Sequence, residues 1–123
     1  MPHIAVDYSD TLSGAFDRSG FGSALHPVIA KTVGASVEGC KTRFRRIDEA
    51  VIGDGSPGQA MIRIEVALLS GRAPESKSEL SRAVLELTRE HLATVPGLTV
   101  HTSVEISDMD RPSYLGHTEV YTA

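Results

Sequence analysis

Apolar and polar residues alternate in several segments of the chain, which is the pattern of strands with one face buried. The segment 59–70 shows it most clearly, with Ile62, Ile64, Val66 and Leu68 on one face and Met61, Arg63, Glu65 and Ala67 on the other. The segment 98–106 alternates in the same way, and the segments 2–8 and 41–52 end at polar or glycine-rich turns. The pattern predicts four strands, over 2–8, 41–52, 59–70 and 98–106.

Two further segments have the spacing of helices. In the segment 75–95, a stripe of side chains that face a core recurs every three or four residues: Leu80, Val84, Leu87, His91 and Val95. Ser76 and Glu79 have the spacing of a capping box at its start. The segment 18–33 is also predicted as a helix, although Pro27 interrupts it.

The order of these elements predicts the architecture. Each half of the chain is a βαβ unit, and two such units side by side give a four-stranded sheet with two helices on one face. We expect an α/β (α+β) fold in a single domain over 1–123. The tail 108–123 is too short for another domain, and we expect it to form a small edge hairpin or to reach a neighbouring subunit.

Composition and charge narrow the class of protein. The chain has 123 residues, 41% hydrophobic and 23% charged, as in ordinary soluble globular proteins. No apolar run approaches the roughly 18 residues of a membrane span, and no export signal is seen. The net charge of −4 argues against nucleic acid. The single cysteine, Cys40, fits a cytoplasmic location and is expected to be a buried small hydrophobe. Aromatic residues are sparse, so association into an oligomer would add stability.

Candidate chemistry begins at Pro2. Removal of Met1 would leave the proline nitrogen as a secondary amine, and burial or nearby cations would lower the pKa of that amine. An amine poised near neutral pH suits proton transfer. The alternative is that the Met-Pro start has no functional consequence.

A basic run follows in the predicted strand 41–52, where Lys41, Arg43 and Arg45 point to one face. Three like charges in a row favour an anionic ligand, and guanidinium groups bind carboxylates in a forked geometry. The alternative is a solvated edge strand whose charges prevent aggregation. Arg72 lies between a strand and a helix start, where an anion can bind, although an ion pair with Glu75 or Glu79 is an equal alternative. The histidines and glycines have no metal-ligand or phosphate-loop spacing, so we expect neither a metal nor a cofactor.

In their order and spacing, several short motifs resemble the 5-carboxymethyl-2-hydroxymuconate delta-isomerase family of the tautomerase superfamily. They are Met1-Pro2-His3, Ser9-Asp10, Pro27, Gly39-x-Lys41-Thr42-Arg43, Asp54-Gly55, Gly71-Arg72-x-x-Glu75-Ser76 and Glu105-Ile106. The resemblance implies a homotrimer with active sites near subunit boundaries and no cofactor. It implies Pro2 as general base, Arg72 as an anion-binding or electrophilic residue, and Arg43 and Lys41 as substrate-binding residues. Lys41 departs from the arginine of close relatives.

The resemblance thus implies a cofactor-independent keto–enol tautomerisation of a small anionic substrate, an unsaturated hydroxy polycarboxylic acid. Two alternatives stay open. The same base could hydrate a haloacrylate or decarboxylate malonate semialdehyde, or the chain could be a non-catalytic trimeric module that binds anions or a partner protein.

Overall fold

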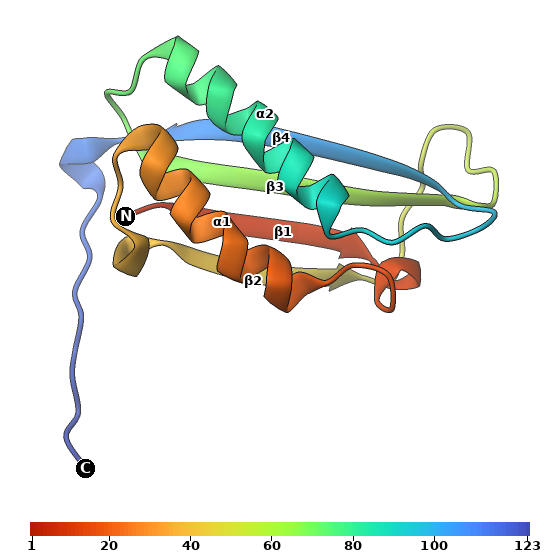
Figure 1. Ribbon diagram of the computed structural model, residues 1–123, viewed down its shortest axis with the longest axis horizontal. Helices are drawn as coiled ribbons and strands as arrows, with labels where there is room; N and C mark the ends of the chain where they lie inside the picture. Colours follow the sequence, from red (N-terminus) through yellow and green to blue (C-terminus); the bar gives the residue numbers. More distant parts are fainter.

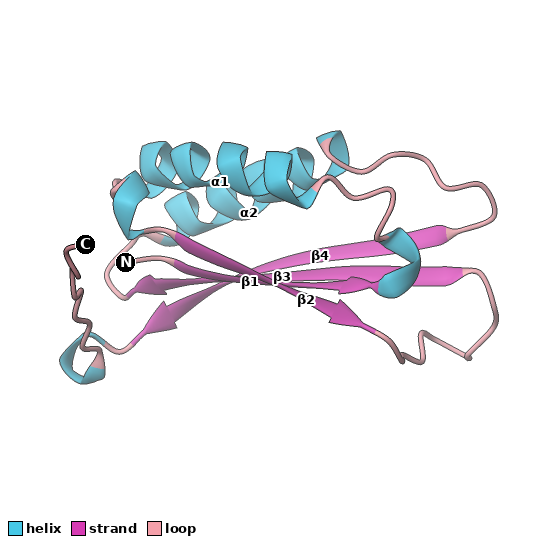
Figure 2. Ribbon diagram, turned by 90° about the horizontal axis from the view of Figure 1, so that it is seen from below, coloured by secondary structure: helices cyan, strands magenta, loops and turns pink.

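The computed structural model describes residues 1–123 and has two layers, a sheet and a pair of helices that cover one of its faces (Figures 1 and 2). The elements in chain order are β1 (His3–Ser9), α1 (Arg18–Val33), β2 (Lys41–Ile47), β3 (Gln59–Leu69), α2 (Pro74–Glu90) and β4 (Thr99–Met109). The strands lie in the order β2-β1-β3-β4. β1 and β2 are parallel, β3 and β4 are parallel, and β1 and β3 are antiparallel. The predicted pair of βαβ units is therefore confirmed.

The core lies between the sheet and the helices. Every second residue of β1 and β3 is buried on that side, and Phe21, Leu25 and Ile29 of α1 and Leu80 and Val84 of α2 cover them. Full burial of a Leu, Ile or Phe side chain contributes about 1.5–3 kcal/mol, so this stripe fixes the faces of both helices. No helix is long and apolar enough to cross a membrane.

Several element boundaries differ from the prediction, and the capping box at Ser76 is wrong. Helix α2 begins at Pro74, one residue before the predicted start at 75, because a proline in the first turn has its φ angle pre-set for the helix. Its N-cap, Ala73, makes no side-chain hydrogen bond. Helix α2 also ends at Glu90 rather than 95. Strand β2 stops at Ile47 rather than 52, because its only neighbour, β1, ends at Ser9, the residue that pairs with Ile47.

The strand register defines two ends of the sheet. His3 of β1 pairs with Lys41 of β2 and Ala67 of β3, and Leu69 of β3 pairs with Met109 of β4. We call this end, where β1 and β2 begin and β3 and β4 end, the proline end. The opposite end, formed by residues 9–12 and 47–59, is called the loop end. The C-terminal tail leaves the body at the proline end (Figure 1).

Candidate active site

The start of the chain is fixed against the sheet at the proline end. Pro2 is buried, and its carbonyl oxygen accepts a hydrogen bond of 3.1 Å from the backbone N–H of Lys41. The 3-10 turn Val37–Gly39 lies beside the terminal amine: a Cβ added at Gly39 would be 3.3 Å from the nitrogen of Met1. The β1–β2 pairing therefore places the first residues in a packed position.

The electrostatic environment favours the uncharged amine. In the chain beginning with Met1, burial is the main cause that lowers the pKa of the terminal amine. Cys40 opposes this effect, and the positive charges of Arg72 and Lys41 add to it. An amine at this place is thus more often unprotonated than an exposed one, which is the property that a general base needs.

Arg72 follows β3 and is half-buried near the end of α1. Its Nη1 donates to the carbonyl oxygen of Leu69 at 2.9 Å, and its Nε donates to the carbonyl oxygen of Val33, the last residue of α1, at 3.4 Å. It makes no ion pair with Glu75 or Glu79, so that alternative is not seen. Two backbone carbonyls orient the guanidinium and leave Nη2 free for an anion.

Lys41 and Arg43 are exposed on β2, on the sheet face opposite the helices. The Nζ of Lys41 donates to the carbonyl oxygen of Gly39 at 3.2 Å, and neither side chain has a carboxylate partner within 4.0 Å. Both lie close enough to His3 that, after burial, their charges lower the pKa of its imidazole. The structure therefore brings all four residues of the predicted site, Pro2, Arg72, Arg43 and Lys41, to the proline end.

Beyond Arg43, the basic run belongs to a different environment. The Nε of Arg45 lies 2.6 Å from the carboxylate of Asp7, and the Nε of Arg46 lies 3.5 Å from the carboxylate of Asp10. β2 is an edge strand of this sheet, as the alternative interpretation expected. That interpretation describes Arg45 and Arg46, which carboxylates neutralise, but not Lys41 and Arg43.

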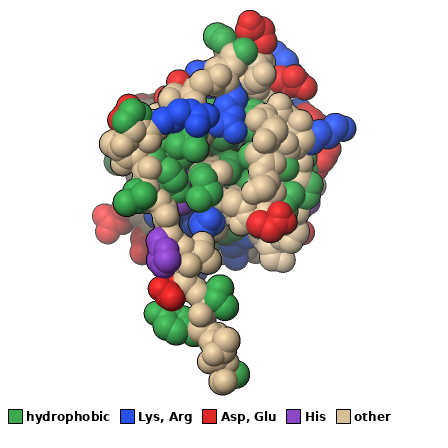
Figure 3. Space-filling model, turned by 90° about the vertical axis from the view of Figure 1, so that its left-hand side faces the viewer, with side chains coloured by type: hydrophobic (Ala, Val, Ile, Leu, Met, Phe, Trp, Pro, Cys, Tyr) green, Lys and Arg blue, Asp and Glu red, His purple; other side chains and the backbone are tan.

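Sequence reasoning missed two residues of the tail that reach this end. The hydroxyl of Tyr114 lies 2.8 Å from Nε2 of His3, and the two rings meet edge to face. The Nε of Arg111 donates to the carbonyl oxygen of Ser70. Residues 3 and 114 are so far apart in the chain that no local pattern could have signalled their contact. Figure 3 shows this face, with Lys and Arg side chains beside an apolar hollow and the tail running away from it.

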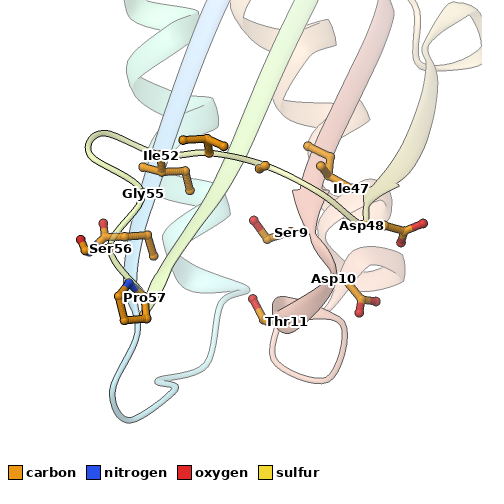
Figure 4. A pocket seen from close by; sticks show the side chains of 13 residues that line it. Ser9, Asp10, Thr11, Ile47, Asp48, Ile52, Gly55, Ser56 and Pro57 are labelled. Atoms are coloured by element: carbon orange, nitrogen blue, oxygen red, sulfur yellow. The ribbon is translucent and has the colours of Figure 1, made fainter.

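A pocket of about 350 Å³ lies instead at the loop end (Figure 4). It is lined by Ser9, Asp10 and Thr11, by Ile47 and Asp48, and by the glycine-rich loop up to Gln59. No Lys, Arg or His lines it, and it contains none of the predicted site residues. A pocket without a cation suits an anionic ligand poorly, so its size does not make it the active site.

The sheet of two βαβ units, with a buried proline beside cations that have no carboxylate partner, agrees with the tautomerase superfamily that the sequence motifs resemble. Within it, the sequence profile of the 5-carboxymethyl-2-hydroxymuconate isomerase family matches residues 2–121. The chain belongs to that family, and hence to the isomerases.

Similar proteins agree with this assignment. The 5-carboxymethyl-2-hydroxymuconate Delta-isomerase of Escherichia coli is 26% identical over 95 residues, 77% of this chain and 75% of that protein. A 5-carboxymethyl-2-hydroxymuconate isomerase from Deinococcus radiodurans R1 has a TM-score of 0.84 at 22% identity, covering 96% of this chain and 90% of that one. A structure described as a Q0 fused 4-OT wild type symmetric trimer has a TM-score of 0.71 at 24% identity, covering 89% of this chain and 86% of that one. These two structures share the fold.

Proposed function

We propose that this isomerase converts an unsaturated hydroxy polycarboxylic acid such as 5-carboxymethyl-2-hydroxymuconate into its keto tautomer, with the amine of Pro2 as general base. One observation carries the proposal: burial and the charges of Arg72 and Lys41 lower the pKa of an amine at the start of the chain. The family profile and the name of the Escherichia coli relative support the substrate class.

The reaction is a proton relocation. The amine of Pro2 removes the proton of the dienol hydroxyl, and the electron pair delocalises over the conjugated system as a dienolate. The protonated amine then returns a proton to a distant carbon of that system, which forms the carbonyl group and moves a double bond. Atoms and charge balance without a redox step, and one base serves both transfers.

The cations have separate tasks in this scheme. Arg72, with its guanidinium oriented by two carbonyls, binds a carboxylate and stabilises the negative charge that develops on the dienolate. Arg43 and Lys41 bind further carboxylates from the open face of the sheet. The ammonium group of Lys41 is a point charge without the forked donors of a guanidinium, so it attracts a carboxylate but does little to orient it.

The scheme requires that Met1 is removed in the cell. While Met1 remains, the nitrogen of Pro2 is a tertiary amide without a basic lone pair. Met1 is 44% exposed, whereas Pro2 is buried. Removing Met1 would leave the amine of Pro2 in the protected position beside Cys40 and Lys41.

We also propose that the chain assembles as a homotrimer, like the symmetric trimer that shares its fold. The tail exposes three apolar side chains that a neighbouring subunit could cover: Leu115, Val120 and Tyr121 are 95%, 79% and 89% exposed. Analytical ultracentrifugation is expected to give three times the 13.1 kDa of one chain. A monomer at micromolar concentration would contradict the assembly.

The test of the function is product analysis in D₂O by ¹H NMR, on protein whose intact mass lacks Met1. We expect loss of the dienol signals and one deuterium at the carbon that receives the proton, since the protonated amine exchanges with solvent. Arg82→Gln is the matched control, because Arg82 is exposed on α2 without a carboxylate partner, and we expect it to keep wild-type turnover. Turnover only of a haloacrylate or of malonate semialdehyde, or no turnover, would contradict the proposal.

A further inference from the structure

Met1 occupies the space in front of the nitrogen of Pro2, which is the space that a substrate of this amine must enter. The carbonyl carbon of Met1 is bonded to that nitrogen, in a position that the lone pair or a proton takes in the free amine. After removal of Met1, the volume that it filled is therefore the volume next to the base. Met1 is 44% exposed, so this volume is open to solvent on one side, as entry of a ligand requires.

Backbone from two distant parts of the chain bounds this volume. At the backbone end of Met1, a Cβ added to Gly39 would lie 3.3 Å from the nitrogen of Met1. At the tip of its side chain, a Cβ added to Gly116 would lie 3.6 Å from the methyl carbon of Met1. After burial, the positive charges of Arg72 and Lys41 are the causes that lower the pKa of the Met1 amine, so both cations act on the same volume. Figures 1 and 2 show the chain start and the segment after β4 at one end of the sheet.

The tail is held at this place by a contact that does not involve Met1. The hydroxyl of Tyr114 lies 2.8 Å from Nε2 of His3, and the two ring centroids are 5.8 Å apart. A Cβ added to Gly116 would also lie 3.6 Å from the hydroxyl of Tyr114, whereas Leu115, between them, is 95% exposed. Tyr114 and Gly116 therefore lie on the side of the tail that faces the start of the chain.

The backbone does not require a glycine at 116. The φ angle of Gly116 lies outside the left-handed region that favours glycine. An added Cβ would have no neighbour closer than 3.6 Å, which is an ordinary van der Waals distance. The chain would therefore accept a side chain here, and a longer one would extend into the volume that Met1 fills.

We propose that residues 114–116, which we call the tail wall, form one wall of the substrate site. Gly116 keeps the volume in front of the amine open, and Tyr114 is a positioning residue that holds the tail wall through His3. The substrate class rests on the proposed function: the conjugated part of an unsaturated acid lies next to the base, and so against the tail wall. The bounded volume itself does not depend on that function.

The first arm of the test is binding of trans,trans-muconate, a planar dicarboxylate without a hydroxyl group to tautomerise. The readout is the ¹⁵N signal of labelled Pro2 in protein that lacks Met1. We expect Gly116→Leu to weaken binding about 10- to 100-fold, the usual effect of inserting atoms into a filled space, and Gly116→Ala to weaken it less. Gly14→Leu is the matched control, because Gly14 is exposed, has no left-handed φ and has open space around its Cβ position.

Two results of this arm would overturn the inference. One is equal binding by Gly116→Leu and the wild type with unchanged melting curves, which would place the ligand away from the tail. The other is a Pro2 signal that muconate does not move in the wild type, because the volume in front of the amine would then not accept a planar carboxylate.

The second arm uses turnover of 5-carboxymethyl-2-hydroxymuconate. Gly116→Leu should lower kcat/KM about 10- to 100-fold, because a substrate displaced from the base by about 1 Å reacts that much more slowly. Tyr114→Phe keeps the ring but loses the hydrogen bond, and it should raise KM by up to about tenfold with little change in kcat. Tyr121→Phe, the same change at an exposed position farther along the tail, is the control. A hydroxyl with only a structural role would instead lower the melting temperature and leave KM unchanged.

The two arms together separate this inference from the proposed function. Wild-type turnover with an unaltered kcat/KM in Gly116→Leu contradicts the tail wall alone. Absence of wild-type turnover, together with muconate binding that Gly116→Leu weakens, contradicts the proposed function and supports the tail wall.

Discussion

The two halves of strand β2 carry similar positive charges, but only one half has carboxylate partners for them. In the half nearer the loop end, Arg45 and Arg46 are paired with Asp7 and Asp10. At the proline end, Lys41 and Arg43 have no carboxylate partner, and Arg72 is bonded only to backbone carbonyls. A charge on a strand does not by itself indicate a site. A group of cations without carboxylate partners in the chain does indicate a site, because their positive charge remains available to bind an external anion.

The two ends also differ in shape. The loop end has the 350 Å³ pocket, but no cation lines it. The proline end has the amine, the arginines and the tail. For an anionic substrate we expect the positive charge of the proline end to matter more than the pocket at the loop end. Experiments that alter one end at a time test this difference.

The largest effect is expected from blocking the terminal amine. One additional residue before Pro2 converts its nitrogen into an amide, and kcat should fall by about 10²–10⁴-fold, the usual contribution of a general base. Stopped-flow or steady-state assays of the tautomerisation measure it, with the melting temperature as a check on folding. A blocked protein with full turnover would show that the base lies elsewhere.

Substituting one arginine at each end compares the two ends directly. Arg72→Gln should lower kcat/KM about 10- to 100-fold, because it removes charged hydrogen bonds to the carboxylate and the dienolate. Arg45→Gln, the matched change in the half of β2 nearer the loop end, should stay within about twofold, as for most surface substitutions. Equal losses in both variants would mean that the whole basic run, rather than its unpaired part, binds the substrate.

A smaller gain is expected at Lys41. Lys41→Arg supplies a forked donor in place of a point charge and should lower KM, by up to about tenfold. Lys31→Arg on the exposed surface of α1 is the control and should leave KM unchanged. A higher KM in Lys41→Arg would indicate that the site is adapted to the lysine.

The smallest effect concerns stability and pH. Burial, Lys41, Arg43 and the terminal amine lower the pKa of His3 below its usual 6.5. The folded state therefore favours the neutral imidazole. The contribution of neutral His3 to the free energy of unfolding is fully present above pH 6.5 and is lost as the pH falls through the lower pKa of the folded state. Urea unfolding at pH 7.5 and 5.5 should show a smaller loss of stability in His3→Gln than in the wild type. Identical losses in both proteins would contradict this assignment.

Local patterns were sufficient for most of the fold. Alternation placed the strands, and α1 spans Arg18–Val33 as predicted despite Pro27, whose side chain faces solvent. The capping box at Ser76 failed because two signals competed, and the proline two residues earlier determined the helix start.

The site was only partly predictable. The motif order placed Pro2 and Arg72 in one family pattern, and the strand register then brought them to the same end of the sheet. Arg111 and Tyr114 were missed, because their contacts with Ser70 and His3 depend on the path of the tail after β4. The sequence also could not distinguish the paired from the unpaired cations of β2, since pairing depends on the strand next to it.

Titration of the terminal amine in the mature protein, by ¹⁵N NMR of labelled Pro2, tests directly whether this nitrogen can act as a base. We predict a pKa below that of the same amine in the unfolded chain, and a rise of this pKa in Arg72→Gln because a nearby positive charge is removed. An amine whose pKa equals that of the unfolded chain, and does not move in Arg72→Gln, would contradict the account.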